Sequence, residues 1–387
     1  MVVDLAKALR IFVLHKMNDM KKIMAGLFAL MLLKQTSNAQ LTTLPNGGNK
    51  KAMVSEQVGL TNITINYSRP SLKGREGKIW GELVPFGYNY LGFGTSRTAP
   101  WRAGANDCTT IEFSTDVTIE GKQLAAGKYG FFIATGKEES TLIFSKNSTT
   151  WGSFFYNPEE DALRVSCRQQ VLDKSIEFLQ FVFLNQTNSA ATIALQWEKW
   201  MFPFKVETDL KKNQAVSFRN ELHGEEGFSS KVFVQAATWC ADNNYNLEEG
   251  LSWAESAITE QYIGEKNFRT LATKARLLKL LGKASESAVI MQEAIPLGSM
   301  IEVHGYARQM MGAKNTAAAA EVFKANYKKF PNVFTTNMGM ARALSSEGKF
   351  KEALKYATAA LPQAPDDANK LMVAEVIGKL KENKDIN

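Results

Sequence analysis

The hydrophobic period of the sequence changes once, near residue 207, and this change limits the fold more than any other feature. Between residues 60 and 207, short runs alternate apolar and polar side chains, as Ile63, Ile65 and Tyr67 do with their neighbours. A period of two is typical of strands with one buried face. Beyond residue 207, small and apolar residues recur at spacings of three and four, which is typical of helices. The chain therefore predicts a β domain followed by an α domain.

The predicted β domain spans residues 40–207. Further strand-like runs lie at 110–114, 117–120, 129–134, 141–145, 163–167, 177–184, 191–197 and 204–207. Gly121, Gly127 and Gly136 punctuate these runs in the manner of tight turns between antiparallel strands. Many short strands with frequent turns predict an antiparallel β-sandwich, with a jelly roll or a partly closed barrel as alternatives.

An internal repeat determines the prediction for residues 231–387. Four segments (246–258, 282–295, 315–331 and 348–365) carry small residues at matching positions, and Gly250, Ser287, Ala319 and Ala353 lie 37, 32 and 34 residues apart. This period predicts tetratricopeptide-like antiparallel helical hairpins; an unrelated helical bundle is the alternative. A connecting helix or linker is expected at 208–230. The residues expected to pack the hairpins together are Ala254, Ala257, Ala294, Ala319, Phe323, Ala353, Ala357 and Ala360.

The first 39 residues have the order of a signal peptide. Lys21 and Lys22 precede the apolar run 23–33, and small residues follow at 37–39, which predicts cleavage before Gln40. Met17 or Met20 is then a better start than Met1. A buried amphipathic helix is the alternative reading. We expect an exported protein, periplasmic or extracellular, with no membrane span after cleavage.

Charge and residue types argue against several classes of function. Residues 40–387 hold 40 basic and 37 acidic side chains with no basic stripe, so nucleic acid is not an expected partner. The β domain lacks histidine and the cysteines lack CxxC spacing, so no catalytic residue, metal site or cofactor is predicted. Cys108 and Cys167 are the one candidate disulfide pair, because both fall in the β domain, although unpaired core residues are the expected state.

A series of motifs in the β domain resembles a known family. The segments are RPSLKGR (69–75), IWGELVPFG (79–87), PWRAGAN (100–106), AGKYGFFI (126–133), FSKNSTTWGSFFY (144–156) and EDALRV (160–165). In this order they resemble exported bacterial proteins classed as domain of unknown function 2911. The resemblance covers residues 45–207 and implies an extracytoplasmic β-sandwich domain with no established activity. It also implies that a helical repeat tail is common after this domain.

One group of residues in the β domain predicts a ligand site. If the turns at 69–75 and 100–106 meet, their cationic and aromatic side chains would suit a carboxylate, a sulfate or a sugar. The group consists of Arg69, Lys73, Arg75, Trp101, Arg102 and Asn106. The alternative is structural, since arginines beside glycine often donate to loop carbonyls and tryptophans often fill cores.

Two neighbouring segments are interpreted structurally. The aromatic run Trp151–Tyr156 is expected to be a buried contact between sheets. Glu159, Glu160 and Asp161 are expected to form a solvated acidic loop rather than a carboxylate pair for glycoside hydrolysis.

These features predict an exported binding or scaffold protein whose helical repeats bind a protein or peptide. The alternative function is binding of, or activity on, a carbohydrate or small anionic ligand by the β domain. A third reading is that the repeats only stabilise the β domain.

Overall fold

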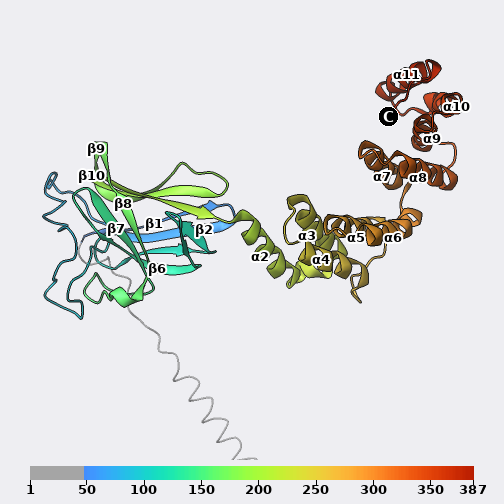
Figure 1. Ribbon diagram of the computed structural model, residues 1–387. Helices are drawn as coiled ribbons and strands as arrows, with labels where there is room; N and C mark the ends of the chain where they lie inside the picture. The colour runs from blue at the N-terminus through green and yellow to red at the C-terminus, as the bar shows by residue number, and fades with distance from the viewer. Residues whose placement is uncertain (1–47) are drawn as a thin grey trace, which may run out of the picture.

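The structure is a computed structural model that describes residues 48–387. All strands precede the α-helices along the described chain: β1–β10 lie between residues 50 and 208, and α2–α11 lie between residues 210 and 381 (Figure 1). The predicted order of a β domain and an α domain is therefore confirmed. The predicted signal peptide, 1–39, lies outside the described residues.

The β domain consists of two antiparallel sheets. The order of the larger sheet is β1 (Lys50–Val58), β2 (Thr61–Arg69), β3 (Thr109–Phe113), β6 (Gly127–Ala134), β7 (Glu139–Ser145) and β8 (Asp161–Arg168). The order of the smaller sheet is β5 (Lys122–Leu124), β4 (Val117–Ile119), β10 (Ala190–Thr208) and β9 (Gln170–Leu184). Sheets of six and four strands form a β-sandwich rather than the eight-stranded jelly roll.

One hydrophobic core joins the two sheets. Alternate residues of β2 point inward, including Ile63 and Ile65, and they join Phe131 from the same sheet. Phe204 comes from β10 in the opposite sheet, and its ring centroid lies 5.7 Å from that of Phe131. Residues from both sheets are fully buried in this core, which identifies the fold as a sandwich.

Three details of the strands differ from the prediction. The strands β1 and β5 were not expected, because their exposed residues are charged or amidic and weaken the apolar signal. The two runs at 191–197 and 204–207 belong to one 19-residue strand, β10. A bulge at Glu198, which has φ 53°, interrupts the alternation of β10 and explains the apparent break.

A second, smaller core lies on the outer face of the larger sheet. Phe132 and Ile143 point away from the main core and pack with Ala99, Cys108 and Tyr156 from the long loops. The loop that joins β2 to β3 and the segment after β7 thus cover β6 and β7. These loops lie at the end of the β domain far from the helices (Figure 1).

Helix α2 (Leu210–Leu222) connects the β domain to the remaining helices and is fixed to the sandwich. Asp209 caps its first turn by accepting a hydrogen bond from the Lys212 backbone N–H at 3.0 Å. The buried Asn213 amide donates to the hydroxyls of Thr61 and Thr115 at 3.2 and 3.0 Å. The predicted connecting segment therefore contains a helix whose first turn is hydrogen-bonded to the β-sandwich.

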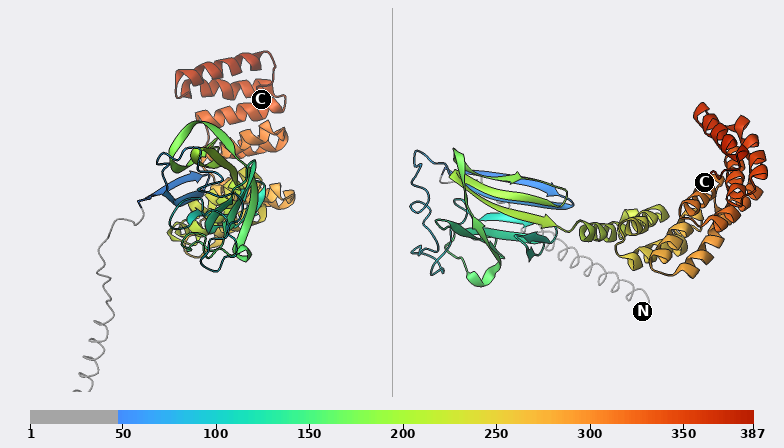
Figure 2. Two further views of the ribbon diagram at one scale, coloured as in Figure 1. Left: turned by 90° about the vertical axis from the view of Figure 1, so that its left-hand side faces the viewer. Right: turned by 45° about the horizontal axis from the view of Figure 1, so that its top comes forward.

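The remaining α-helices form successive hairpins that stack into a curved array (Figure 2). The helices are α3 (Ser230–Asn243), α4 (Leu247–Thr259), α5 (Phe268–Leu280), α6 (Ala284–Ala294), α7 (Met300–Gly312), α8 (Thr316–Lys329), α9 (Phe334–Ser346), α10 (Phe350–Ala360) and α11 (Asp367–Lys381). The pairs α3/α4, α5/α6, α7/α8 and α9/α10 pack closely, as the repeat predicted. Among residues 48–387, no helix is long and apolar enough to cross a bilayer.

Small side chains allow the helices of the array to approach one another. The eight residues predicted to pack the hairpins are all buried: Ala254, Ala257, Ala294, Ala319, Phe323, Ala353, Ala357 and Ala360. At Gly250 in α4, an added Cβ would lie 2.7 Å from the Cβ of Cys240 in α3. The contact between α3 and α4 therefore requires a residue without a side chain at this position.

Candidate functional site

The odd-numbered helices α3, α5, α7 and α9 form the inner face of the array. Helix α3 contacts α5 and α7 contacts α9, whereas neighbouring even-numbered helices approach each other less closely. Helices lie closer together on the inside of a curved stack, so the odd-numbered row lines the concave side (Figure 2). This inner face is the candidate functional site of the α domain.

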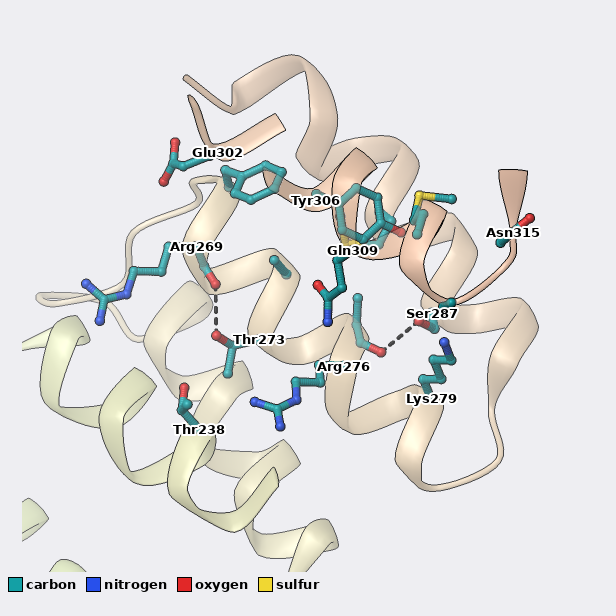
Figure 3. A pocket seen from close by; sticks show the side chains of 16 residues that line it. Thr238, Arg269, Thr273, Arg276, Lys279, Ser287, Glu302, Tyr306, Gln309 and Asn315 are labelled. Carbon is teal, nitrogen blue, oxygen red and sulfur yellow. Dashed lines mark hydrogen bonds between the residues drawn. The ribbon is translucent and has the colours of Figure 1, made fainter. Parts of the chain in front are cut away.

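A pocket of about 510 Å³ opens in the inner face between α5 and α7, with Thr238 of α3 at its edge (Figure 3). Its apolar lining includes Ala272, Tyr306 and Met310. Gln309 points into the middle of the pocket from α7 (Figure 3). The pocket thus combines an apolar floor with a free amide, a combination suited to the backbone and side chains of a peptide.

The pocket carries an excess of positive charge. Arg269, Arg276 and Lys279 line it, and Glu302 is its one carboxylate among the described residues. Glu302 accepts hydrogen bonds from the hydroxyl and backbone N–H of Ser299, which hold the pKa of Glu302 below its usual range. Arg276 pairs with Asp242, whereas no ion pair within residues 48–387 engages Arg269 or Lys279. Free cations in a half-apolar pocket favour an acidic ligand.

An arginine recurs at the same position in three inner helices. Each of α5, α7 and α9 is followed by a residue in the left-handed conformation, at positions 282, 314 and 348. Six residues before these positions stand Arg276, Arg308 and Arg342. The residue before each arginine is a buried alanine, which fixes the helix against its neighbour and directs the arginine to the inner face. The repeat analysis missed this series, because it compared only the small residues.

His304 and two of these arginines lie close together between α7 and α9. The pKa of His304 is lowered to about 4, chiefly by burial and also by the charges of Arg342 and Arg308. Burial and the nearby Arg308 also lower the pKa of Arg342. Among residues 48–387, no carboxylate lies within ion-pair distance of either arginine. This part of the inner face therefore holds concentrated positive charge.

The depressed pKa of His304 predicts a pH-dependent stability of the array. The unfolded chain binds a proton at His304 near pH 6.5 and the folded chain only near pH 4, so the free energy of unfolding falls as the pH drops from 6.5 to 4. We expect His304→Gln to flatten this dependence in thermal unfolding followed by circular dichroism. The matched control is His223→Gln, the same substitution at an exposed histidine. An unaltered slope in His304→Gln would contradict the assignment.

The predicted arginines of the 69–75 segment donate hydrogen bonds to backbone carbonyls of the β domain. Arg69 Nε donates to the Leu179 carbonyl at 2.9 Å. Arg75 donates to the carbonyls of Leu72 and Ser71, both at 2.9 Å. Lys73 is exposed and has a left-handed backbone with φ 51°. The guanidinium groups of Arg69 and Arg75 thus stabilise the loop, and ligand binding by this group stays a prediction.

The turn at 100–106 contacts Trp80 through the indole of Trp101. The indole of Trp101 donates to the Gly104 carbonyl at 3.1 Å and lies edge-on to Trp80, with ring centroids 5.7 Å apart. Arg102 is half-buried against Gly152, and burial lowers its pKa. Asn106 is left-handed at φ 58° and accepts a hydrogen bond from Asn49. These contacts join the 100–106 turn to Trp80, which follows the 69–75 segment along the chain, and the meeting of the two predicted turns stays a prediction.

The prediction that the run 151–156 is buried between the sheets is wrong. Residues 152–155 form turns, and Trp151, which makes an isolated β-bridge with Asp107, is 58% exposed. Phe93, which is 67% exposed, packs edge-on against Phe154 and Phe155 with centroids 5.7 and 6.1 Å apart. Gly152, at φ 67°, reverses the chain and ends the apparent strand. The loops thus expose an aromatic patch, defined by Phe93, Trp151, Phe154 and Phe155.

The acidic loop is solvated only in part. Glu159 is exposed, but the side chain of Asp161 is 6% exposed, which contradicts the expectation for this residue. Asp161 Oδ2 accepts hydrogen bonds from the Tyr156 hydroxyl at 2.7 Å and from Arg164 at 2.6 Å. These contacts connect the start of β8 to the loops that carry the aromatic patch.

Residues 49–206 match the model of a family described as "Protein of unknown function (DUF2911)". These residues belong to that family. The match runs from the start of β1 to the end of β10, so the DUF2911 domain is the β-sandwich and the helices lie beyond it. The resemblance drawn from the sequence motifs is confirmed at the level of the family.

Comparisons beyond the DUF2911 domain are less close. No curated protein matches the chain. Among solved structures, the Cut9–Hcn1 hetero-tetramer of the APC/C is 13% identical, with 45% of this chain and 33% of that chain covered and a TM-score of 0.30. YrrB, a TPR protein with an unusual peptide-binding site, is 17% identical over 44% of this chain and 86% of that chain, with a TM-score of 0.29. MamA from Desulfovibrio magneticus RS-1 is 14% identical over 40% of this chain and 94% of that chain, with a TM-score of 0.27. The assignment of helical hairpins therefore rests on the helix packing of this chain.

The cysteines of the DUF2911 domain are unpaired. Cys108 lies in the small outer core and Cys167 in the main core, so they are on different faces of the sheet. Burial raises the pKa of Cys108 to about 11 and that of Cys167 to about 12, and Cys240 in α3 is also free and buried. Residues 48–387 contain no cluster of three side chains that could hold a metal ion.

Proposed function

We propose that this protein binds an extended acidic segment of a partner protein along the inner face of its helical array. The pocket between α5 and α7 carries this proposal. It offers an apolar floor, the amide of Gln309, and the cations Arg269 and Lys279, for which residues 48–387 supply no ion pair. Arg269 and Lys279 lie at opposite ends of α5, so a peptide with a carboxylate at either cation and an apolar side chain against Met310 would satisfy both parts of the pocket.

The position of the pocket supports a peptide rather than a small molecule. The pocket opens on a row of inner helices, and arginines continue along this row at Arg308 and Arg342. A linear ligand can follow such a row and contact one position in each hairpin. The fixed attachment of α2 to the DUF2911 domain then makes that domain the anchor of the array.

Selection of displayed random peptides on the full chain tests the proposal. We expect the selected peptides to be rich in Asp and Glu, and the double variant Arg269→Gln, Lys279→Gln to bind them at least about tenfold more weakly. The matched control removes two exposed cations outside the pocket, Lys283→Gln and Lys351→Gln, and keeps the affinity. Equal losses in both variants would contradict a pocket at α5 and α7.

We further propose that the protein acts outside the cytoplasm. The order of charged, apolar and small residues in 1–39 supports export, as does the nearly balanced charge of the remaining chain. Amino-terminal sequencing of the protein isolated from producing cells should give Gln40 as the first residue. A chain that retains residues 23–39 would contradict cleavage at this position.

A second candidate function is sugar binding by the DUF2911 domain. The aromatic patch favours it, because Phe93 and Trp151 present exposed rings beside Phe154, with ring centroids 5.7 and 5.8 Å from it. A glycan array probed with the full chain should lose its signal in the variant Phe93→Ala, Trp151→Ala. Phe228→Ala removes an exposed ring beyond α2 and serves as the control. Signals that survive in the double variant would exclude the patch as a sugar site.

A further inference from the structure

The residues that follow α11 return to the inner face and pack against α9. Asn383, at φ 55°, reverses the chain. The hydroxyl of Ser345 lies 2.6 Å from Asp385 Oδ1 and 3.1 Å from the backbone nitrogen of Ile386, donating to the first and accepting from the second. Ile386 is 8% exposed and joins the hydrophobic cluster that contains Met338 and Leu344. A short segment of this chain thus occupies the surface of α9.

The charge of the segment matches the surface beneath it. Arg342 donates from Nη1 to the Ile386 carbonyl at 3.3 Å, and the Asn387 amide donates to the Arg342 carbonyl at 3.1 Å. Asp385 is the acidic group whose charge acts on Arg342, whereas Arg308 contributes positive charge from α7. Burial raises the pKa of the Asp385 carboxyl, but hydrogen bonds from Ser345, Asn387 and two backbone N–H groups outweigh burial and lower it overall. The carboxylate is therefore held in its charged form.

The positions that Arg342 and Ser345 occupy in α9 have counterparts in α5, where they line the pocket between α5 and α7. When α5 and α9 are aligned on Gly282 and Gly348, Arg276 corresponds to Arg342 and Lys279 to Ser345. Each pair offers two hydrogen-bond donors, one helical turn apart, to a carboxylate on the inner face. The contact of Asp385 with Ser345 therefore shows, within this chain, the kind of residue that these positions accept.

We propose that α9, with the apolar cluster that it shares with α10 and α11, holds a binding site for an acidic residue followed by an aliphatic residue, and that Asp385 and Ile386 of the same chain occupy it until a partner segment displaces them. This inference rests on the proposed function, since it gives the ligand chemistry of the same inner face. Asp385 is held by the hydroxyl of Ser345 and attracted by Arg342, while Ile386 fills the apolar site beside them. A partner segment that runs from α5 to α9 competes with these two residues for the last position.

A peptide in trans tests the proposal. The probe is a fluorescein-labelled, amidated peptide of residues 381–387, Lys-Glu-Asn-Lys-Asp-Ile-Asn. Its affinity is measured by fluorescence anisotropy for the full chain and for the full-length variant Asp385→Asn, Ile386→Ser. We expect the variant to bind the probe at least about tenfold more tightly, because its own segment no longer competes. Equal affinities, or no binding to either chain, would overturn the proposal.

Two controls make the outcome specific. A probe that carries Asn and Ser in place of Asp385 and Ile386 should not bind. Adding Arg342→Gln to the variant should weaken binding of the original probe at least about tenfold. Thermal unfolding shows whether the double variant keeps its last hairpin folded. If Ile386→Ser unfolds that hairpin, the single variant Asp385→Asn takes the place of the double variant.

The two proposals fail separately. If the inner face binds selected acidic peptides through Arg269 and Lys279 but never the 381–387 probe, only the internal occupant is excluded. If the probe binds at α9 but no peptide depends on the pocket cations, the pocket between α5 and α7 is excluded as the main site.

Discussion

Replacing Ala353 with arginine should lower the thermal unfolding midpoint of the helical array by about 10 °C. Ala353 is fully buried where α10 packs against α9, in the cluster that contains Met338 and Val373. An arginine there must overpack the contact and bury an unpaired charge, at a cost of about 4 kcal/mol. For an array of this size, that cost corresponds to the stated shift.

Differential scanning calorimetry of the full chain measures the effect of Ala353→Arg. The control is Thr358→Arg, which places the same side chain at an exposed position of the same helix and should shift the midpoint little. We expect the transition of the DUF2911 domain to stay in place, because its core lies in the sandwich. Equal midpoints for the two variants would show that α9 and α10 do not pack through Ala353.

Two glycines of the array should respond to the same substitution with opposite signs. At Gly250, an added Cβ would lie 2.7 Å from Cys240 Cβ and 3.2 Å from Leu277 Cδ2. Gly250→Leu therefore forces α3 and α4 apart, at a cost of about 3 kcal/mol. Gly305 in α7 is exposed and has no atom within 4 Å of the added Cβ. Gly305→Leu should instead stabilise its helix by about 0.5–1 kcal/mol, because leucine favours the helix more than glycine does.

Urea unfolding followed by circular dichroism compares the two leucine variants. We expect the transition of the array to move to lower urea for Gly250→Leu and to slightly higher urea for Gly305→Leu. A Gly250→Leu variant as stable as the unsubstituted chain would mean that the close approach of α3 and α4 is absent.

The sequence alone predicts the architecture well where local pattern and packing agree. The alternation in β2 and the spacing of Ala319 and Ala353 both follow from which side chains must be buried. The bulge at Glu198 and the turn at Gly152 could not be predicted in this way, because backbone conformations stabilised by distant contacts produce them. At Gly152, an aromatic run of the kind that often fills a contact between sheets continues through a segment that is not a strand, which explains the error at Trp151.

The candidate site was less predictable than the fold. Arg69 and Arg75 have the residue type expected of an anion site, yet only the structure shows that backbone carbonyls of β9 and of the 69–75 turn accept their hydrogen bonds. The arginines of the inner face were visible in the sequence, but they align only when the helices are compared at their left-handed ends. The contact of Asp385 with Ser345 spans 40 residues and carries no local pattern.

Photocrosslinking in producing cells tests the central claim most directly. A photoreactive phenylalanine analogue replaces Gln309, which points into the pocket between α5 and α7, or Lys351, which is exposed on α10. We predict a crosslinked partner from position 309 that disappears with Arg269→Gln and Lys279→Gln, and none from position 351. Crosslinks of equal yield from both positions, or a partner that persists without the two cations, would contradict binding on the inner face.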